Sequence, residues 1–517
     1  MAQLPALPAQ VAINGHFSAT ESSSDAAVMA AVRGGVQHVI FILKENRGYD
    51  QVLGDLEVGN GDPSLTEFGQ ALTPNLHNLA RTFVTLDNMM VSSEVSNDGW
   101  PWSTSARAPD VIEHQYLSFY AGRGLSLDYD GLNRNVNVSI PTVAGRVAAD
   151  PLTPADGNLL PGPANTAAPD GPDDVADRGQ GYLWDAALRA GLTVRDYGFF
   201  VDTTLYACPA PNGVACIPST LTNPFLTKTQ VAFADSVALA PFTDPYYRGF
   251  DNAFPDYYRF QEWSRDFDAN YAKSGLPALS LVRLMHDHTG NFNDPGGYGL
   301  NTPELQQADN DYAVALLVQK IANSVYANNT LIFVIEDDSQ DAGDHVDSHR
   351  TVAFVAGAYV KQGALVSTPY NTINFVRTME EVLGLPPMNL NDALARPMAD
   401  IFNTTPTTWS FTATPSAYLY PPNTNLPLTL PVGMVVPRPL HNGQYWARAT
   451  RGMDFTSEDR MDFGEYNRIL WRGIMGNKPY PASSTGKDLR QNREKLLARY
   501  RQSLKQNAAQ AKRASTN

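Results

Sequence analysis

The chain has 517 residues, of which 43% are hydrophobic, and its formal net charge is −15. This length allows two or three average domains, or one large α/β domain with insertions. The excess of acids argues against nucleic-acid binding, because proteins that track phosphate backbones present a basic surface. No apolar run reaches the roughly 18 to 20 residues that span a bilayer, so we expect no transmembrane segment.

Only two cysteines occur, Cys208 and Cys216, and they bracket a turn rich in Pro, Gly and Asn. This spacing indicates a small disulfide-closed loop, with two free thiols as the alternative. A lone cysteine pair of this kind suits an exported protein. No positively charged leader with an apolar centre precedes the fold. We therefore expect a periplasmic or secreted protein whose signal peptide is absent from this sequence.

Strand and helix patterns alternate through most of the chain. In chain order, the predicted elements are a strand at 36–43, a helix at 73–80, a strand at 83–91, a helix at 182–190, strands at 193–200 and 279–285, a helix at 302–326, strands at 331–335 and 352–357, and a helix at 371–383. Apolar, β-branched runs such as 36–43 are typical of buried parallel strands. The pattern predicts an α/β fold with a mostly parallel central sheet and helices on both faces.

The pattern also predicts the domain boundaries. Residues 1–35 are expected to be a flexible segment, and residues 36–402 a single catalytic domain with a loop insertion at about 126–177. Residues 403–517 are expected to wrap over the same domain and to end in a helical tail. In sheets of this kind, ligands bind at the carboxyl ends of the strands.

The strand at 331–335 is followed at once by Asp337 and Asp338, and residues 339–350 then add further acids and histidines. Adjacent carboxylates at the end of a rigid strand are tolerated when a cation or a set of donors neutralises them. Four of the nine histidines fall between His286 and His349. This composition predicts a metal site, and the alternative is a polar loop whose acids serve solubility.

Several motifs occur together in a fixed order. They are KENRGYD at 44–50, TPNL at 73–76, MHDHT at 285–289, ADND at 308–311 and EDDSQDAGDHVDSHR at 336–350. Between about residues 37 and 402, the chain resembles the phosphoesterase family of bacterial acid phosphatases and phospholipases C. That family is part of the alkaline-phosphatase-like superfamily.

The resemblance implies one divalent metal ion, held by a Glu-Asn pair, a nucleophilic hydroxyl and an Asp-Asp pair. The matching positions here are Glu45, Asn46, Ser96, Asp337 and Asp338. Oxygen donors from separate strand ends suit Zn, Mn, Ca or Mg, and such an ion can activate a serine. The position of the hydroxyl favours Ser96, with Ser92 and Ser93 as alternatives whose ordinary role is in turns and helix caps.

The resemblance further implies that His288, His345 and His349 bind phosphate and protonate the leaving alkoxide, because imidazole changes its charge near neutral pH. Alternatively, His345 or His349 only hydrogen-bonds a ligating carboxylate. The chain departs from the family at two positions. Trp100 stands where close relatives tend to have histidine, and His286 stands where the family usually has asparagine.

Four further charged residues lie inside these motifs. Arg47 and Arg350 follow the two metal motifs, and we expect them to pair with neighbouring acids rather than to clamp phosphate. Asp309 and Asp311 are expected near the start of the helix at 302–326, where acids complement the helix dipole. Their functional alternative is a contact to a ligand residue.

The sequence therefore predicts a metal-dependent phosphoric ester hydrolase of the acid-phosphatase type that acts through a phosphoserine intermediate. The alternative is a phospholipase C that cleaves phospholipid head groups. A rival of another class is a catalytically silent metal-binding protein of the same fold. Sulfatase chemistry is disfavoured because no cysteine lies near Ser96. The expected partner is a phosphorylated small molecule or a phospholipid, and the oligomeric state stays open.

Overall fold

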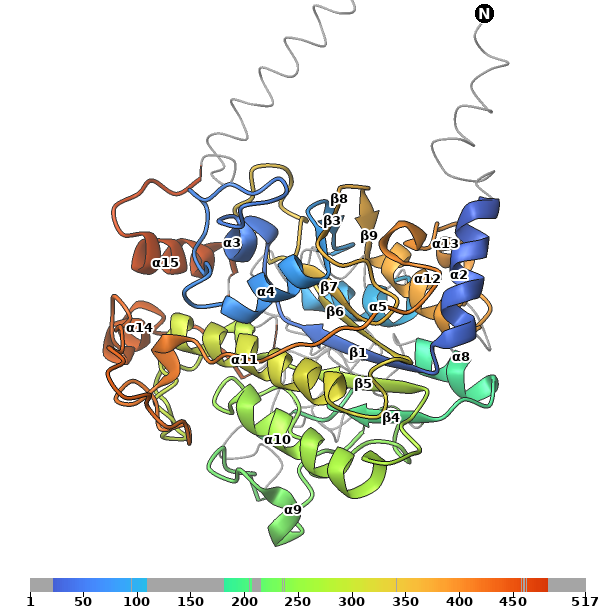
Figure 1. Cartoon of the computed structure of the whole chain (residues 1–517). Helices are drawn as coiled ribbons and strands as arrows, with labels where there is room; N and C mark the ends of the chain where they lie inside the picture. Colours follow the sequence, from blue (N-terminus) through green and yellow to red (C-terminus); the bar gives the residue numbers. More distant parts are fainter. Residues whose placement is uncertain are drawn as a thin grey trace, which may run out of the picture.

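The structure is a computed structural model that describes residues 22–481, except 94, 109–180, 204, 207–214, 235, 237, 341, 457, 459, 460 and 462. Its centre is a five-stranded sheet in the order β4-β5-β1-β6-β7 (Figure 1). The strands are β1 (His38–Lys44), β4 (Val194–Tyr197), β5 (Leu279–Arg283), β6 (Thr330–Glu336) and β7 (Ala353–Gly357).

The sheet is parallel except at one edge. β1 runs parallel to β5 and β6, β4 runs parallel to β5, and β7 runs antiparallel to β6. All residues of β5 and β6 are buried, which explains why these strands read as continuous apolar runs. The fold class predicted from the sequence is confirmed.

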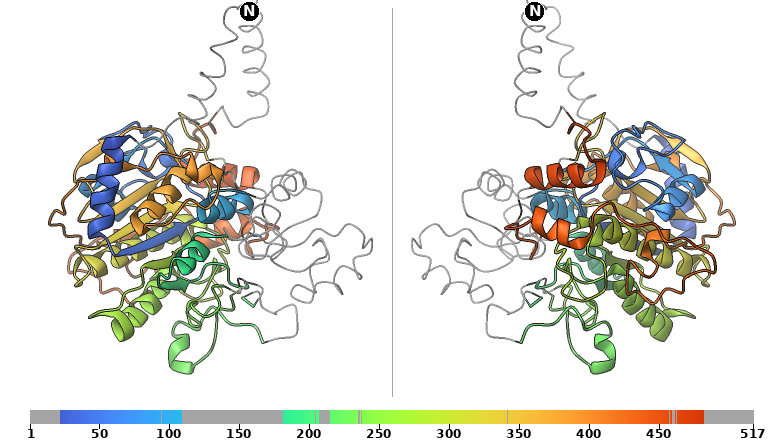
Figure 2. Two further views of the ribbon diagram at one scale, coloured as in Figure 1. Left: turned by 90° about the vertical axis from the view of Figure 1, so that its right-hand side faces the viewer. Right: turned by 90° about the vertical axis from the view of Figure 1, so that its left-hand side faces the viewer.

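Helices cover both faces of the sheet. α4, α10 and α11 lie on one face, and α5 and α12 lie on the other (Figures 1 and 2). The helices are α2 (Ser23–Gly35), α3 (Tyr49–Leu53), α4 (Pro74–Thr82), α5 (Ser96–Ser105), α8 (Leu183–Arg189), α9 (Pro224–Thr227), α10 (Asp256–Asp266), α11 (Pro303–Ala322), α12 (Thr372–Leu383), α13 (Leu390–Ala393), α14 (Gly443–Ala449) and α15 (Phe463–Met475). α11 begins where the sequence predicts, because the side chain of Thr302 caps it and Pro303 fills its first position.

The run at 83–91 is not one strand of the central sheet. It forms two short strands, β2 (Val84–Leu86) and β3 (Met89–Met90), which pair in parallel with β8 (Ala364–Val366) and β9 (Tyr370–Asn371). The prediction of a single strand was wrong because a turn at 87–88 interrupts the run. A local apolar pattern cannot reveal that its partners lie almost 300 residues further along the chain.

The expectation of a flexible segment over residues 1–35 was wrong for its last part. Residues 23–35 form α2, whose N-terminus is capped by Ser22. Met29 and Val32 lie three residues apart on one helix face and are buried in the main core. α2 packs there against α12 (Figure 1). The preceding residues lie outside the described part.

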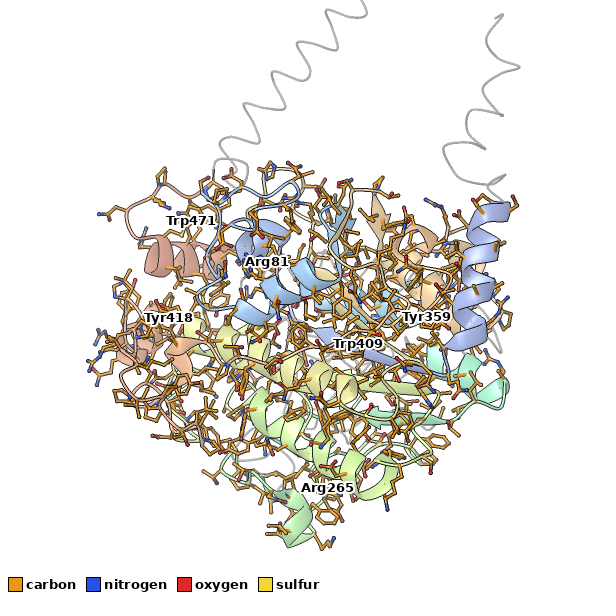
Figure 3. All side chains as sticks on the ribbon, viewed as in Figure 1. Arg81, Arg265, Tyr359, Trp409, Tyr418 and Trp471 are labelled. Carbon is orange, nitrogen blue, oxygen red and sulfur yellow. The ribbon has the colours of Figure 1, made fainter. Side chains whose placement is uncertain are left out.

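Residues 403–440 cross the surface largely without regular structure, as predicted. Trp409 (Figure 3) anchors this stretch, because it is buried in the main core and its indole N–H donates to Ala327 O at 2.8 Å. The predicted insertion at 126–177 and the predicted tail beyond 481 lie outside the described residues, and so does Cys208 of the expected disulfide. No helix in the described part of the chain is long and apolar enough to cross a membrane.

Candidate metal and nucleophile site

The ends of β1, β5 and β6 meet at one edge of the sheet. Their register pairs Leu43 with Arg283 and Lys44 with Glu336. The residues after β1 and β6 therefore emerge side by side. These residues are Glu45, Asn46, Asp337 and Asp338, and all four are fully buried.

Ser96 is the first residue of α5 and is brought to the same place. Its hydroxyl oxygen lies 3.3 Å from Glu45 Oε2, 3.4 Å from Asn46 Oδ1 and 3.0 Å from Asp338 Oδ2. A hydroxyl has one proton and can donate it to only one of these acceptors. The serine oxygen thus faces more oxygen atoms than hydrogen bonding alone can satisfy.

Asn46 shows the same crowding of acceptors. It follows β1 with φ of 66°, a left-handed conformation that asparagine tolerates better than most residues. Its side-chain oxygen faces Asp337 Oδ1 at 2.9 Å and Asp338 Oδ2 at 3.0 Å, while its nitrogen faces Gln340 Nε2 at 2.8 Å. Turning the amide over would make all three contacts hydrogen bonds. A cation among the oxygens would favour the amide as it stands if the Gln340 amide were also turned, so that its oxygen accepts from Asn46.

The donor set fits a divalent cation. In an octahedral site with metal–oxygen distances of about 2.1 Å, neighbouring ligand oxygens lie about 3.0 Å apart. In a tetrahedral site with distances of about 2.0 Å the separation is about 3.3 Å. The oxygen–oxygen distances at Ser96 and Asn46 run from 2.9 to 3.4 Å. Carboxylates, an amide oxygen and a hydroxyl are also ligands that hard or borderline cations accept.

A glycine explains how α5 approaches the end of β6. A Cβ at Gly99 would lie 2.7 Å from Asp337 O, so only glycine fits at this contact without a backbone shift. Gly99 is in the first turn of α5, three residues after Ser96. The glycine thereby lets the serine and the Asp-Asp pair lie against each other.

Two buried cations lie behind the oxygen cluster. Lys44 Nζ lies 2.6 Å from Glu336 Oε1 and 2.7 Å from Asp287 Oδ2. Burial alone would favour the neutral amine, but these two carboxylates outweigh it and raise the pKa of Lys44. Lys44 is therefore a permanent positive charge that joins the ends of β1 and β6 to the loop after β5.

The second cation, Arg283, holds Glu45. Its Nη2 donates to Glu45 Oε1 at 2.6 Å and to Glu458 Oε1 at 2.8 Å. Burial raises the pKa of Glu45 to about 8, and Arg283 opposes this shift. With Oε1 bonded to Arg283, Oε2 is the oxygen that faces Ser96. The arginine thus sets the orientation of the Glu45 carboxylate.

His288 lies in the short 3₁₀ turn at His286–His288 and is fully buried. Its Nε2 is 3.1 Å from Glu458 O, and Phe250 packs edge-on against the ring. Burial and the positive charge of Arg47 lower the pKa of His288 to about 4, so the imidazole is neutral at ordinary pH. Arg47 itself donates to the carbonyl oxygens of Asp287 and His288, so it binds backbone rather than acids.

The other two predicted histidines, His345 and His349, lie in the loop after β6, and each contacts a carboxylate. His345 Nδ1 is 2.6 Å from Asp50 Oδ2, and His349 Nδ1 is 2.8 Å from Asp347 Oδ1. This loop forms turns instead of a helix, so the two rings do not share a helix face. Both side chains are partly exposed, at 32% and 39%.

Asp50, Asp344 and His345 form a separate group whose possible ligand atoms all lie within 4.8 Å of one another. Arg350 already neutralises this group, because its Nη2 lies 2.9 Å from Asp50 Oδ1 and 3.0 Å from Asp344 Oδ2. The guanidinium occupies the position that a cation would need. The expectation that Arg350 pairs with acids is confirmed.

The two departures from the family pattern have structural roles. His286 Nδ1 lies 2.6 Å from Asp309 Oδ2, which ties the turn to α11. Trp100 is buried, and the Arg283 guanidinium lies 4.7 Å from the centre of its ring. A cation over an indole face is favourable. Trp100 therefore supports the arginine that orients Glu45.

Asp309 and Asp311 were expected near the start of α11, but they lie in the middle of this helix. Each caps another helix: Asp309 accepts the N–H groups of Asp256 and Tyr257 at the start of α10, and Asp311 accepts those of Asn75 and Leu76 at the start of α4. The acids complement helix dipoles, but those of neighbouring helices.

Ser93 has its own partners. Its hydroxyl donates to Val95 O at 2.5 Å or to the Asp98 carboxylate, and its oxygen accepts the N–H of Val95 at 3.0 Å. These contacts are those of a turn residue before a helix. Ser92 donates its N–H to Thr372 Oγ1. Of the three serines, Ser96 is the one whose hydroxyl contacts the oxygen cluster.

The sequence reasoning missed Arg283 and Glu458. Arg283 could have been found, because it places a charge inside the largely apolar run predicted as a strand at 279–285. Glu458 carries no local signal, since it lies in an irregular stretch before α15 and reaches the site only through the tertiary fold. The C-terminal segment also contributes Tyr466, whose hydroxyl lies 2.6 Å from Thr289 Oγ1.

A scan against protein-family models finds no match, and a search of curated proteins finds none either. Among solved structures, the chain is similar to a protein in the alkaline phosphatase superfamily from Vibrio parahaemolyticus, at 15% identity over 72% of this chain and 77% of that one, with a TM-score of 0.35. It is also similar to a sulfatase from a Pseudoalteromonas species, at 10% identity over 76% of this chain and 78% of that one, with a TM-score of 0.41. A sulfatase from Bacteroides thetaiotaomicron is 10% identical over 71% of this chain and 77% of that one, with a TM-score of 0.39.

Proposed function

We propose that this chain is a metal-dependent phosphoric ester hydrolase of the alkaline-phosphatase-like superfamily, with Ser96 as its nucleophile. The observation that supports it is the contact of one serine hydroxyl with oxygens of Glu45, Asn46 and Asp338, at distances of 3.0 to 3.4 Å. A divalent cation held by these residues and Asp337 supplies Lewis acidity and lowers the pKa of a nearby hydroxyl.

The chain's own residues provide the remaining parts of the reaction. The Ser96 hydroxyl gives up its proton, for which Asp338 Oδ2 at 3.0 Å is an acceptor, as its oxygen attacks phosphorus. The bond from phosphorus to the ester oxygen breaks, and the departing alkoxide takes up a proton from a proposed histidine or from water. The first turn of α5 begins at Ser96, so its N–H groups are available to bind the transferring phosphoryl group. Water then attacks the phosphoserine and releases phosphate and the free hydroxyl.

His288, His345 and His349 stay proposed as donors to the phosphate or the leaving group. Each has a fixed orientation, through Glu458 O, Asp50 and Asp347. The neutral state of buried His288 suits hydrogen bonding better than proton delivery. The partly exposed pair, His345 and His349, suits proton transfer with solvent.

The test is hydrolysis of three p-nitrophenyl esters, a phosphate monoester, a phosphate diester and a sulfate, with and without a chelator. We expect hydrolysis of a phosphate ester that the chelator abolishes and an added divalent metal restores. Ser96→Ala should lower kcat at least about a thousandfold, and Asp338→Asn should weaken metal binding. Ser93→Ala is the matched control and should keep most activity, because its hydroxyl serves a turn.

The outcome also separates the alternatives. Faster cleavage of the diester than of the monoester favours the phospholipase C type. Bound metal without hydrolysis of any ester indicates the catalytically silent protein. Full turnover of Ser96→Ala contradicts the proposed nucleophile. Export, proposed from the cysteine pair, is tested by showing that Cys208 and Cys216 are bonded in the purified protein.

A further inference from the structure

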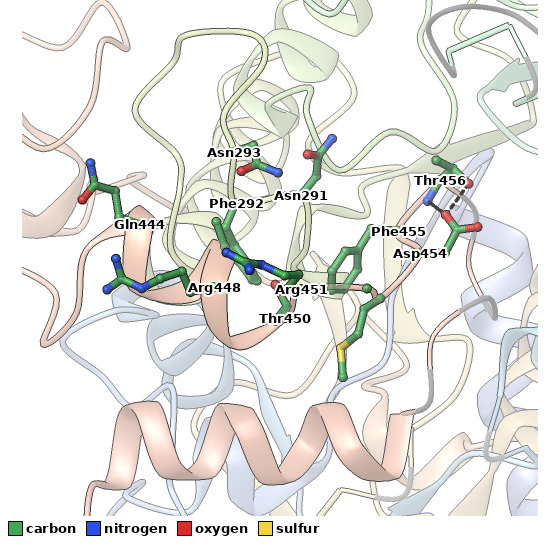
Figure 4. A pocket seen from close by; sticks show the side chains of 13 residues that line it. Asn291, Phe292, Asn293, Gln444, Arg448, Thr450, Arg451, Asp454, Phe455 and Thr456 are labelled. Atoms are coloured by element: carbon green, nitrogen blue, oxygen red, sulfur yellow. Dashed lines mark hydrogen bonds between the residues drawn. The ribbon is translucent and has the colours of Figure 1, made fainter.

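A cavity of about 600 Å³ lies at the side of α14, between the C-terminal segment and the loop that follows the His286–His288 turn (Figure 4). Residues 291–293 form one wall, and residues 444–456 contribute the other. Nothing in the proposed reaction uses this cavity. Because the cavity lies beside the loop that follows His288, a ligand bound in it would lie next to a segment of the proposed site.

Two arginines line the cavity, Arg448 and Arg451, and both are exposed. Neither side chain forms an ion pair or a hydrogen bond with any residue in the described part of the chain. The cavity has one acidic lining residue, Asp454, whose carboxylate accepts the N–H and the hydroxyl of Thr456 at 2.9 and 2.5 Å. In a chain with 53 acids and 38 bases, a cavity in which arginines outnumber acids is a local reversal of charge.

The rest of the lining supplies neutral donors and an apolar wall. The side-chain amides of Asn291, Asn293 and Gln444 line the cavity and make no hydrogen bonds to described residues. Phe455 adds an aromatic surface (Figure 4). Guanidinium groups bind the oxygens of phosphate or sulfate, and amides bind hydroxyl groups. The lining therefore fits an anionic ligand that also carries hydroxyl groups.

The loop that forms the first wall is held in a strained shape. Thr289, Asn291 and Asp294 are non-glycine residues with positive φ values of 56°, 50° and 50°. Such conformations are disfavoured for L-residues and persist where the surroundings fix them. Gln306 fixes this loop by bonding both Gly290 N at 2.8 Å and Gly290 O at 2.7 Å. A loop held in this way presents its amides without further ordering, which favours binding.

A second cavity adjoins this one. It measures about 380 Å³ and shares Asn291, Asn293, Phe455 and Thr456 with the first. It is also lined by Phe250, whose ring centre lies 5.1 Å from the Arg283 guanidinium and 5.0 Å from the His288 ring. Phe250 is therefore in contact with both the second cavity and the arginine that holds Glu45.

We propose that the cavity at Arg448 and Arg451 is a subsite for a second anionic group, a phosphate or sulfate, carried by the substrate whose ester is cleaved at Ser96. This inference rests on the proposed function. It narrows the substrate class to hydroxyl-bearing esters with two anionic groups. A soluble sugar bisphosphate and a phosphorylated inositol lipid both have this chemistry.

The kinetic test compares wild type with Arg448→Gln, Arg451→Gln and the double variant. Arg438→Gln is the matched control, because Arg438 is exposed and lies outside the cavity lining. Substrates are p-nitrophenyl phosphate, fructose 1,6-bisphosphate, and phosphatidylcholine vesicles with and without phosphatidylinositol 4-phosphate. For the double variant we expect KM for the bisphosphate or the phosphoinositide to rise about tenfold, from the loss of two exposed charge contacts. Its kcat/KM for p-nitrophenyl phosphate should stay within about twofold. Equal losses on all substrates, or none on any, overturn the subsite.

A binding experiment separates this inference from the proposed function. Calorimetry with fructose 1,6-bisphosphate, and vesicle flotation with the phosphoinositide, are carried out in the presence of chelator. Binding by wild type and by Arg438→Gln, but not by the double variant, supports the subsite. If these proteins bind the probes but hydrolyse no ester, the proposed function is refuted and the subsite is not. Absence of binding to both probes by wild type overturns the subsite whatever the catalytic result.

Discussion

The contact between Glu458 and Arg283 gives the sharpest prediction about the metal site. Glu458 is 2% exposed, and the same arginine nitrogen, Nη2, bonds both Glu458 and Glu45. Glu458→Gln removes one negative charge while keeping the size of the side chain and one oxygen acceptor. We expect this variant to bind a divalent cation more weakly than the wild type.

The magnitude follows from the geometry. Two carboxylate oxygens on one nitrogen, at 2.6 and 2.8 Å, are about 5 Å apart, and a cation on the far side of Glu45 lies about 7 Å from Glu458. A unit negative charge and a divalent cation at about 7 Å interact by about 5 kcal/mol at an effective dielectric constant of about 20. The dissociation constant should therefore rise about a thousandfold.

The assay is a competition between the metal-free protein and a fluorescent chelator for Mn²⁺ or Zn²⁺, with thermal unfolding measured in parallel. Glu57→Gln is the matched control, because it removes the same charge from an exposed pair with Arg81. We expect its affinity to stay within about twofold of wild type. If Glu458→Gln binds the cation as tightly as wild type and unfolds at the same temperature, the cation does not lie beside Glu45 and the reasoning is refuted.

Three further predictions concern stability. Asp311→Ala should lower the free energy of unfolding by about 2 to 4 kcal/mol, because it leaves buried N–H groups at the start of α4 without an acceptor. The control Asp268→Ala, which removes an exposed ion pair with Lys320, should lower it by under about 0.5 kcal/mol. Urea unfolding of both variants measures this difference. Trp409→Ala should cost about 3 to 5 kcal/mol in the same assay, and a value below about 1 kcal/mol would show that residues 403–440 are not part of the core. Burial, with the charge of Asp392, raises the pKa of Glu380 to about 10 from its ordinary value of 4.5. Since the folded state then holds a proton that the unfolded state releases, this group's contribution to stability is present below pH 4.5 and is lost as the pH rises towards 10. Glu380→Gln should thus unfold at a higher temperature than wild type at pH 8, with the difference disappearing near pH 4.

Elements with a strong local signal were predicted from the sequence. The strand ending at Lys44 and the strand ending at Glu336 are apolar runs with polar residues directly after them, which is what burial on both faces of a parallel sheet requires. α11 was predicted from the helical spacing of its apolar residues, and α12 from a helical run that ends at Gly384. Elements whose stability depends on distant partners were not predicted from the sequence. β2 and β3 are short strands paired with residues far along the chain, and α2 is stabilised by packing against α12.

The candidate site divides in the same way. The residues that follow strand ends could be placed together from topology alone, because parallel strands end at one edge. The orientation of each side chain could not. Whether Asp311 caps its own helix or another depends on how α11 packs against α4. The involvement of Glu458 depends on where the C-terminal segment docks, and no residue near it in sequence signals a buried acid.

The arrangement of buried charge at this edge of the sheet supports the proposed metal site. Lys44 is shared by Asp287 and Glu336, so one positive charge lies between two carboxylates. Arg283 is shared in the same manner by Glu45 and a carboxylate of the C-terminal segment. Each triad therefore leaves a surplus of negative charge, and the Asp-Asp pair after β6 adds to it. Burying unneutralised carboxylates is costly, and protonating them would remove the oxygen ligands that face the serine. A divalent cation held at the proposed site would balance this surplus and keep the oxygen ligands ionised, so the pattern of buried charge supports the proposed metal ligands.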